Sequence, residues 1–325
     1  MEAGDALARA AEAGIHTLRI PTPFAVGRVN CYLIEDEPLT LVDTGPNSGK
    51  ALDELQTQLA ALGHSIDDIE LVVLTHQHVD HVGLAEIIVQ HSGAEVAALD
   101  VAVERLANFS RDAELDDRFA AQLMLRSGIP ENVVVALQGV SASFRGWGSK
   151  VKVTRPLADG EVLELANRRL EVQHRPGHSP SDTVFWDADR RILLAADHLI
   201  AHISSNPLIS RPLDGSDQRT QALVSYIESL QRTRELPAEL VLSGHGDPIT
   251  DHAALIDERL ARTERRKRKI LGLIGEHGPV SGHELAQLLW GNVAVTQAFL
   301  TLSEVIGHID LLMNEGAVAE EEPDD

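Results

Sequence analysis

A run of metal-ligating side chains follows directly on an apolar segment at residues 71–83, which read LVVLTHQHVDHVG. Borderline metal ions such as zinc bind imidazole nitrogen and carboxylate oxygen readily. Four ligands at this spacing cannot all point at one tetrahedral ion from a regular helix or strand. An irregular loop lets them serve two ions, and the expected pairs are His76 with His78 and Asp80 with His81.

Ligand-type side chains also stand at the ends of three other strand-like runs. One of these side chains, His245, has a glycine on each side, which lets the backbone approach a crowded site. Four separate strand ends with such residues are far more specific than any single match. We therefore expect the strand ends to converge on one metal centre, which also includes His178 after residues 170–173, Asp197 after 192–196 and His245 after 240–243.

Strands that alternate with helices predict an α/β architecture in which helices cover the faces of the sheets. Runs rich in Val, Ile and Leu are typical of buried strands, and segments with a period near 3.6 residues are typical of helices. The expected helices are 49–62, 84–91 and 217–232. The expected strands are 29–34, 39–42, 70–74, 169–173, 192–195 and 239–242.

A helical insertion is expected at about residues 100–150. Residues 100–127 are polar and amphipathic, which predicts two helices, and two glycines predict a flexible loop at 144–150. Aromatic, methionine and histidine side chains here and after the strand-end aspartate are candidates for the wall of a substrate cleft, although such residues more often belong to the core. These candidates are Phe109, Met124, Phe144, Trp147, His198 and His202.

The sequence pattern changes after residue 251, where a long charged helix and several compact helices are expected. Residues 1–257 are expected to form the catalytic domain. Residues 258–325 are expected to form a small winged-helix-like domain with a short strand at 317–318 and an acidic tail. The apolar helices of this second domain need a surface to pack on, which favours packing or a homodimer.

The order of the ligand groups resembles the metallo-β-lactamase superfamily, whose members carry HxHxDH, a GH[ST] histidine, a strand-end aspartate and a GH histidine. The resemblance covers about residues 15–257, and LVDTG at 41–45 is similar to the family's first motif. It implies a four-layer αββα sandwich with the metals at one edge of the two sheets. Such a fold would explain why the strand ends converge on a single site.

The same resemblance implies two zinc ions, with iron or manganese as alternatives. Asp197 would bridge the two ions, and Asp43 would orient a ligating histidine. The other ligands would divide between the ions, with His76, His78 and His178 on one and Asp80, His81 and His245 on the other.

Two divalent ions that share a water lower its pKa towards neutrality and so supply hydroxide at pH 7. We therefore expect a hydrolase that uses a metal-bridging hydroxide, with Asp80 and Asp197 as its catalytic carboxylates. No protein nucleophile is needed for this chemistry. The sequence has no GxSxG elbow, and its one cysteine, Cys31, lies in a strand-like run away from the ligand loops.

Acidic residues outnumber basic ones by 50 to 28, which gives a formal net charge of −22. Such a surface repels phosphate backbones and anionic membranes, so we expect neither a nucleic-acid nor a membrane partner. The densest basic run, 262–269, is expected to be a solvated helix face that pairs in part with Glu258 and Glu264. No signal-like N-terminus or long apolar stretch is present, and with a single cysteine this favours the cytoplasm.

The substrate class has several interpretations. An aspartate at 197 argues against an antibiotic-destroying member of the family, and the segment 196–207 resembles glyoxalase II-like hydrolases. The layout of the whole chain resembles the β-lactamase-like protein 2 group, which contains an endoribonuclease and thioesterases. We expect a small carbonyl substrate, a thioester or an ester or lactone. The alternatives are an endoribonuclease or phosphodiesterase, an iron-dependent member, and a non-catalytic metal-binding protein.

Overall fold

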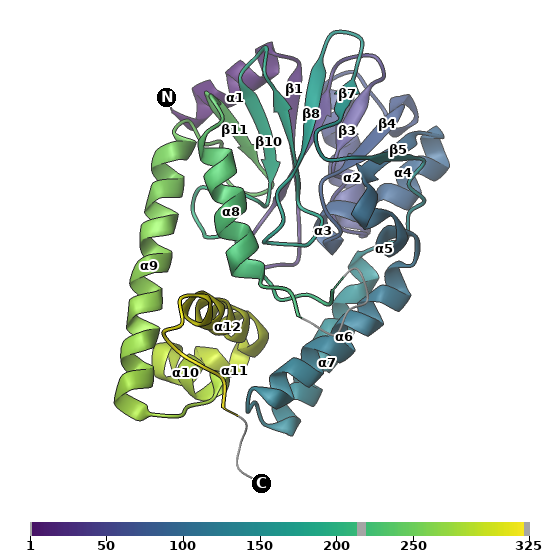
Figure 1. The fold of residues 1–325 in the computed structure, drawn as a ribbon. Helices are drawn as coiled ribbons and strands as arrows, with labels where there is room; N and C mark the ends of the chain where they lie inside the picture. Colours follow the sequence, from purple (N-terminus) through teal and green to yellow (C-terminus); the bar gives the residue numbers. More distant parts are fainter. Residues whose placement is uncertain (1, 213–218, 322–325) are drawn as a thin grey trace.

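A computed structural model describes residues 2–212 and 219–321 of the chain. Two β-sheets pack face to face, and helices cover both outer faces (Figure 1). The first sheet has six strands in the order of the chain, antiparallel from the first to the third and parallel from the third to the sixth. They are β1 (Ile15–Ile20), β2 (Val29–Ile34), β3 (Thr40–Val42), β4 (Leu71–Leu74), β5 (Glu95–Leu99) and β6 (Arg155–Leu157).

The second sheet has five strands in the order β11-β10-β9-β8-β7. Only β10 and β11 run parallel, and the other pairs are antiparallel. The strands are β7 (Val162–Glu164), β8 (Arg169–His174), β9 (Thr183–Asp187), β10 (Ile192–Ala196) and β11 (Leu240–Ser243).

Three apolar layers hold the sandwich together. The layer between the sheets joins residues such as Val73 and Phe185, which are fully buried. Outside the first sheet lie α2 (Gly49–Ala61) and α4 (Ala85–Ser92), and outside the second lies α8 (Ala222–Arg234) together with the start of α9 (His252–His277). The short helix α1 (Ala3–Glu12) adds Ala6 and Ala10 to the layer between the sheets. The expected αββα sandwich is confirmed.

All six expected strands are present, and five further strands, β1, β5, β6, β7 and β9, were not expected. The missed strands lack the continuous Val, Ile and Leu runs that mark a buried strand. Polar residues interrupt β1, and alanine, a poor strand former, makes up part of β5. The predicted helix at 217–232 begins at Ala222, while residues 217 and 218 lie outside the described part.

The insertion contains α5 (Val103–Ala107), α6 (Phe109–Arg126) and α7 (Glu131–Phe144). The first two match the pair expected at 100–127. The third was not expected, and the prediction of a flexible loop at 144–150 is wrong in part. Phe144 ends α7, a short 3-10 helix (Arg145–Trp147) follows, and Ser149 Oγ donates a 3.2 Å hydrogen bond to the carbonyl of Val82.

The C-terminal region is helical, with α10 (Gly282–Trp290), α11 (Val293–Thr296) and α12 (Ala298–Asn314) after α9. Residues 244–321 form no strand, so the wing expected at 317–318 is not found and a winged helix is not confirmed. The predicted boundary at 257/258 falls inside α9, which is one continuous helix. None of the described helices is long and apolar enough to cross a bilayer.

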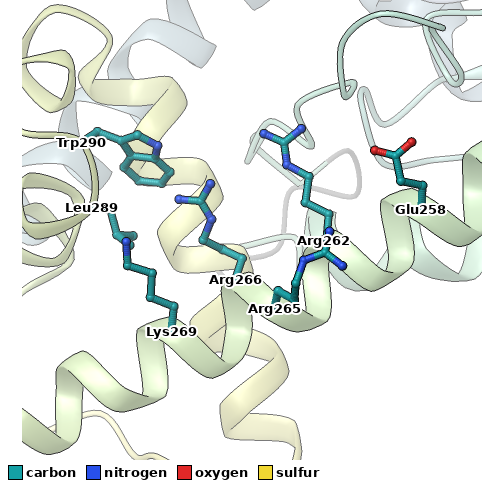
Figure 2. Close-up of a pocket in the computed structure, with 7 residues that line it drawn as sticks. All are labelled: Glu258, Arg262, Arg265, Arg266, Lys269, Leu289 and Trp290. Atoms are coloured by element: carbon teal, nitrogen blue, oxygen red, sulfur yellow. The ribbon is translucent and has the colours of Figure 1, made fainter.

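The C-terminal helices pack on their own chain. Helix α12 contacts α6, α8 and α9, and its residues Leu302, Val305 and Leu312 are buried. Asp310 is also buried, and its carboxylate pairs with the guanidinium of Arg219. The guanidinium carbon of Arg266, on α9, lies 4.7 Å from the centre of the ring of Trp290, at the end of α10 (Figure 2). The apolar helices therefore find much of the surface they need within the chain, and the expected homodimer stays a prediction.

Candidate metal centre

Three histidines from two strand ends converge on one point. His76 and His78 follow β4, and His178 lies in the loop after β8. His78 Nδ1 lies 3.0 Å from His76 Nε2 and 2.9 Å from His178 Nε2. Three nitrogens this close together leave room for one ion that binds all of them. The structure thus brings together the first predicted ligand set.

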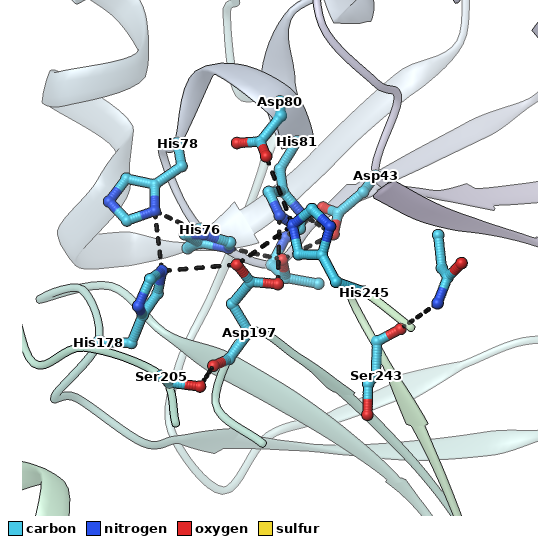
Figure 3. Close-up of polar contacts among 12 residues, drawn as sticks. Asp43, His76, His78, Asp80, His81, His178, Asp197, Ser205, Ser243 and His245 are labelled. Atoms are coloured by element: carbon cyan, nitrogen blue, oxygen red, sulfur yellow. Dashed lines mark hydrogen bonds and ion pairs between the residues drawn. The ribbon is translucent and has the colours of Figure 1, made fainter. Parts of the chain in front are cut away.

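A second group forms beside the first. Asp80 and His81 belong to α3 (Val79–Val82), a single helical turn where an irregular loop was expected, and His245 follows β11. His245 Nε2 lies 3.4 Å from Asp80 Oδ2. One ligand atom from each of these three buried residues lies within 4.8 Å of the other two, so the three could hold one metal ion. Figure 3 shows the division of the ligands: Asp80 and His81 lie beside His245, whereas His78 lies beside His178.

Asp197 lies between the two groups. Its Oδ2 atom is 3.6 Å from His178 Nε2 and 3.5 Å from His245 Nε2, and its Oδ1 atom is 3.4 Å from His81 Nε2. Asp197 follows β10, whose register shifts at its end, where Ala196 adopts a positive φ of 43°. This local strain turns the carboxylate into the space between the ligands. The geometry is that of a carboxylate which can contact two ions.

The polar atoms of the site lack partners of their own. His81 Nε2, His245 Nε2 and Asp197 Oδ1 are buried, and no described group forms a hydrogen bond with them. A buried polar atom without a partner is costly unless a ligand or water satisfies it. These three atoms all face the centre of the cluster (Figure 3). Imidazole and carboxylate donors arranged in this way fit a metal ion.

The electrostatics of the two histidine groups differ. Burial lowers the pKa of His78 to about 3 and keeps the pKa of His76 well below its usual value, so both rings are neutral at pH 7. Burial also disfavours charge on His245, but the Asp197 and Asp80 carboxylates outweigh it and raise its pKa to about 9. Around His81, the carboxylates of Asp197 and Asp43 likewise overcome burial and raise its pKa. The field at this second group favours positive charge, which a metal cation would supply in place of protons.

Hydrogen bonds on the far side of each ring fix its orientation. Asp43 Oδ2 lies 2.7 Å from His81 Nδ1, as predicted for a residue that orients a ligand. Asp43 itself accepts hydrogen bonds from the backbone N–H and the hydroxyl of Thr75, at 2.9 and 2.8 Å. His178 Nδ1 lies 3.2 Å from the carbonyl of Asn206, and His245 Nδ1 lies 2.9 Å from that of Arg28.

Apart from Asp43, these supporting groups were missed in the sequence, because two of them are backbone carbonyls and carry no side-chain signal. Thr75 directly precedes His76 and offered a weak one. A small residue is also required next to His245. A Cβ atom on Gly244 would overlap Asp197 Oδ1 and lie 3.0 Å from His81 Cε1, so only glycine leaves the carboxylate its place.

The residues predicted to wall a cleft have different locations. His202 is exposed and lies against the loop of His245, because a Cβ on Gly246 would lie 2.5 Å from His202 Nδ1. The ring of Phe109 packs on Gly148, and the carbonyl of Trp147 accepts a 2.7 Å hydrogen bond from the backbone of Asn47. Both side chains are partly exposed, and the short helix that holds Trp147 contacts α3, which carries candidate ligands.

The other three candidates for the cleft wall, His198, Met124 and Phe144, pack against other parts of the protein. The ring of His198 is buried behind β10, where it lies 2.8 Å from Thr233 Oγ1 and edge-on to Tyr226. Burial lowers its pKa to about 3. Met124 belongs to the core between the insertion and α12, and Phe144 contacts Phe24 at a centroid distance of 5.4 Å. The structure places His198 and Met124 in cores and not in the wall of a cleft.

Comparison with known proteins gives a consistent picture. Residues 25–245 match the family model described as the metallo-beta-lactamase superfamily. The chain is 34% identical over 301 residues to the probable metallo-hydrolase YqjP of Bacillus subtilis, covering 93% of this chain and 92% of that protein. It superimposes with a TM-score of 0.80 and 30% identity on the crystal structure of the metallo-beta-lactamase family protein TTHA1429 from Thermus thermophilus, which covers 95% of this chain and 96% of that one.

Two more distant relatives carry names of a reaction. Hydroxyacylglutathione hydrolase GloC of Haemophilus influenzae is 25% identical over 234 residues, covering 70% of this chain and 90% of that protein. Acyl-coenzyme A thioesterase MBLAC2 of Bos taurus is 31% identical over 137 residues, which is 39% of this chain and 40% of that protein.

Proposed function

Since this chain belongs to the metallo-β-lactamase superfamily, we propose that this metallo-hydrolase cleaves a small acyl thioester, or an ester or lactone, at a binuclear zinc centre. The observation that carries the proposal is the pair of three-residue ligand groups with Asp197 between them. One group alone would describe a mononuclear site. Two groups that meet at one carboxylate support a site for two ions.

The ligand residues would bind the two ions in two groups. His76, His78 and His178 would hold one ion and Asp80, His81 and His245 the other, with Asp197 shared. When bound, the two zinc ions supply Lewis acidity and hydroxide at neutral pH. Asp43 holds His81 with its Nε2 atom towards the site, and the Asn206 and Arg28 carbonyls do the same for the rings of two other ligands.

The chain leaves the ligand loops free of positive charge, which supports a neutral or weakly charged substrate. The loops at 75–83, 177–182 and 197–206 contain no lysine or arginine. Arg175, two residues before one of them, is buried and donates to Thr233 Oγ1 at 3.2 Å and to Gln173 Oε1 at 2.5 Å. Its guanidinium is therefore not available to a phosphate.

Three cations of the insertion, Arg105, Arg145 and Lys150, lie beside carboxylates, whereas Arg111, Arg118 and Arg126 form no ion pair among the described residues. Arg145 pairs with Asp117, and Lys150 lies 3.9 Å from Glu86. Lys152 is exposed and is left without an ion pair among the described residues. An RNA substrate needs several cations along its phosphates, and each one adds to binding. The lack of lysine and arginine in the ligand loops favours the acyl substrate over the ribonuclease or phosphodiesterase, and the two distant relatives named for hydroxyacylglutathione and acyl-coenzyme A point the same way.

The metal content is tested by elemental analysis of protein purified without added metal. We expect close to two equivalents per chain, mainly zinc, because the ligand set is complete and buried. An Asp80→Ala variant provides the control, since it removes one ligand of the second group and should lower the content towards one. A wild-type content near zero, with no uptake from buffer, would contradict the whole assignment.

The substrate class is tested by comparing kcat/KM for a generic acyl thioester, a lactone and a single-stranded RNA over a range of salt. We expect the thioester or the lactone to be preferred and its hydrolysis to depend little on salt, because the loops beside the metals carry no cation. The Asp80→Ala variant should lose the activity. RNA cleavage that is faster, steeply dependent on salt and abolished by Asp80→Ala would establish the nuclease instead.

A further inference from the structure

A second, chemically different site lies in the C-terminal region, away from the metal ligands. A hollow of about 560 Å³ opens between α9 and the end of α10 (Figure 2). Four of its seven lining side chains are cationic, one is acidic and two are apolar. They are Arg262, Arg265, Arg266, Lys269, Glu258, Leu289 and Trp290. A concentration of cations like this is unusual for a chain of net charge −22.

The cations of this hollow, which we call the basic hollow, share one face of α9. Positions 262, 265, 266 and 269 are three or four residues apart, so their side chains are neighbours on the helix surface. Like charges at this spacing destabilise a helix by a few tenths of a kcal/mol per pair. A solvated helix face that pairs in part with Glu258 and Glu264 was expected here, and among the described residues the pairing within the helix involves Glu264 and not Glu258.

The other two cations of the run 262–269, Lys267 and Arg268, lie beside carboxylates. Lys267 Nζ lies 2.9 Å from Glu264 Oε2 and also contacts Glu315, and Arg268 Nε lies 3.8 Å from Glu264 Oε1. Within residues 2–212 and 219–321, no carboxylate forms an ion pair with Arg262, Arg265 or Lys269. Three charges therefore remain free to act on a ligand.

The fourth cation is held in place beside an aromatic ring. Arg266 stacks over Trp290 at 4.7 Å, and its Nε atom lies 3.5 Å from Glu304 Oε1. Both Arg266 and Trp290 are partly buried, so this pair forms a preorganised wall of the basic hollow. Arginine side chains bind phosphate oxygens in a bidentate manner, and an indole ring or a guanidinium plane can stack with a planar heterocycle.

We propose that the basic hollow binds a small ligand that carries at least two phosphate groups and a planar ring, such as a nucleoside polyphosphate. Its volume lies in the range of sites for ligands of this size. A long nucleic acid is a poorer fit, because the cations form one short cluster and not a track, and Glu258 stands at one end of it. The proposal is independent of the reaction at the metal centre.

Binding of ADP to the full-length protein, measured by isothermal titration at low and physiological salt, tests the proposal. We expect one ADP per chain and weaker binding as salt rises. Arg262→Gln and Lys269→Gln should each weaken ADP binding by about tenfold, because each removes a charged contact to phosphate. Arg268→Gln is the matched control: it removes one charge from the same helix outside the hollow and should change the affinity less than about twofold.

The other probes separate the parts of the ligand. Adenosine should bind far more weakly than ADP, and Trp290→Leu should weaken ADP more than inorganic pyrophosphate, which has no ring to stack. Absence of ADP binding, equal affinity for adenosine, or an equal loss in Arg268→Gln would each overturn the proposal. Preferential binding of a single-stranded RNA oligomer would also overturn it, in favour of a nucleic-acid surface. These measurements read binding and not turnover, so they stand even if the proposed hydrolysis fails.

Discussion

Replacement of Asp43 by asparagine tests how the chain prepares His81 for a metal. Asp43 adopts a positive φ of 58°, a conformation that asparagine tolerates better than most residues, so Asp43→Asn changes the chemistry with little backbone strain. Its Oδ2 atom lies 2.7 Å from His81 Nδ1 and accepts from the Thr75 hydroxyl at 2.8 Å. An amide nitrogen at this position would donate, and a protonated His81 Nδ1 would face it as a second donor.

The conflict is relieved if the proton of His81 moves to Nε2. That nitrogen is the one that faces the centre of the cluster, where it lies 3.4 Å from Asp197 Oδ1 and has no hydrogen-bond partner among the described groups. A protonated Nε2 cannot bind a metal. Loss of a group that orients a metal ligand typically costs 10–100-fold in metal affinity or activity, which is about 1.4–2.8 kcal/mol. A hydrogen bond to a charged group contributes a similar free energy to stability, about 1.5–3 kcal/mol.

The assay is a zinc titration against a chelating competitor, together with elemental analysis. We expect Asp43→Asn to weaken one of the two ions by about 10–100-fold and to leave the other nearly unchanged, since no ligand of the first group contacts Asp43 through its carboxylate. Asp182→Asn is the matched variant: the buried carboxylate of Asp182 accepts from the backbone and hydroxyl of Ser179, next to His178. It should affect the ion of the first group instead.

Circular dichroism and the unfolding temperature distinguish this effect from a loss of the fold. If Asp43→Asn folds like the wild type and binds both ions with unchanged affinity, the account of the His81 tautomer is refuted. If both variants weaken the same ion, the division of the ligands into two groups is refuted.

The remaining predictions concern the carboxylate between the groups and the glycine beside it. Asp197→Asn should abolish turnover and lower the metal content from two ions towards one, with little change in the fold, because one carboxylate contacts both groups. Turnover comparable to that of the wild type would show that the bimetallic assignment is wrong. Gly244→Ala should lower kcat/KM by about 100-fold, since its Cβ would displace Asp197 Oδ1. Gly139→Ala, in α7 with nothing within 4 Å of the added Cβ, is the control and should keep full activity and gain about 0.5–1 kcal/mol in the free energy of unfolding; equal losses in the two variants would refute the crowding argument.

The α/β architecture and the convergence of the seven candidate ligands could be predicted from the sequence. Each ligand follows an apolar strand or lies on the turn just after one, and a strand places its last residue at a sheet edge wherever the rest of the chain goes. The signal is local: a hydrophobic run, a break, and a histidine or aspartate. The same local reasoning failed for α7, whose VVVAL run at 133–137 is no helical pattern, and for missed strands such as β5, where no continuous run of Val, Ile and Leu marks the element.

Tertiary structure alone decided the contacts that combine residues far apart in the chain. The Arg28 carbonyl at His245 and the Asn206 carbonyl at His178 come from backbone, which carries no side-chain pattern to read. Burial of His198 follows from packing of α8 over β10, and the open face of the basic hollow follows from the end of α10 lying beside α9. Distances and exposure depend on how elements pack, and packing is a property of the whole chain, so no short stretch of sequence contains it.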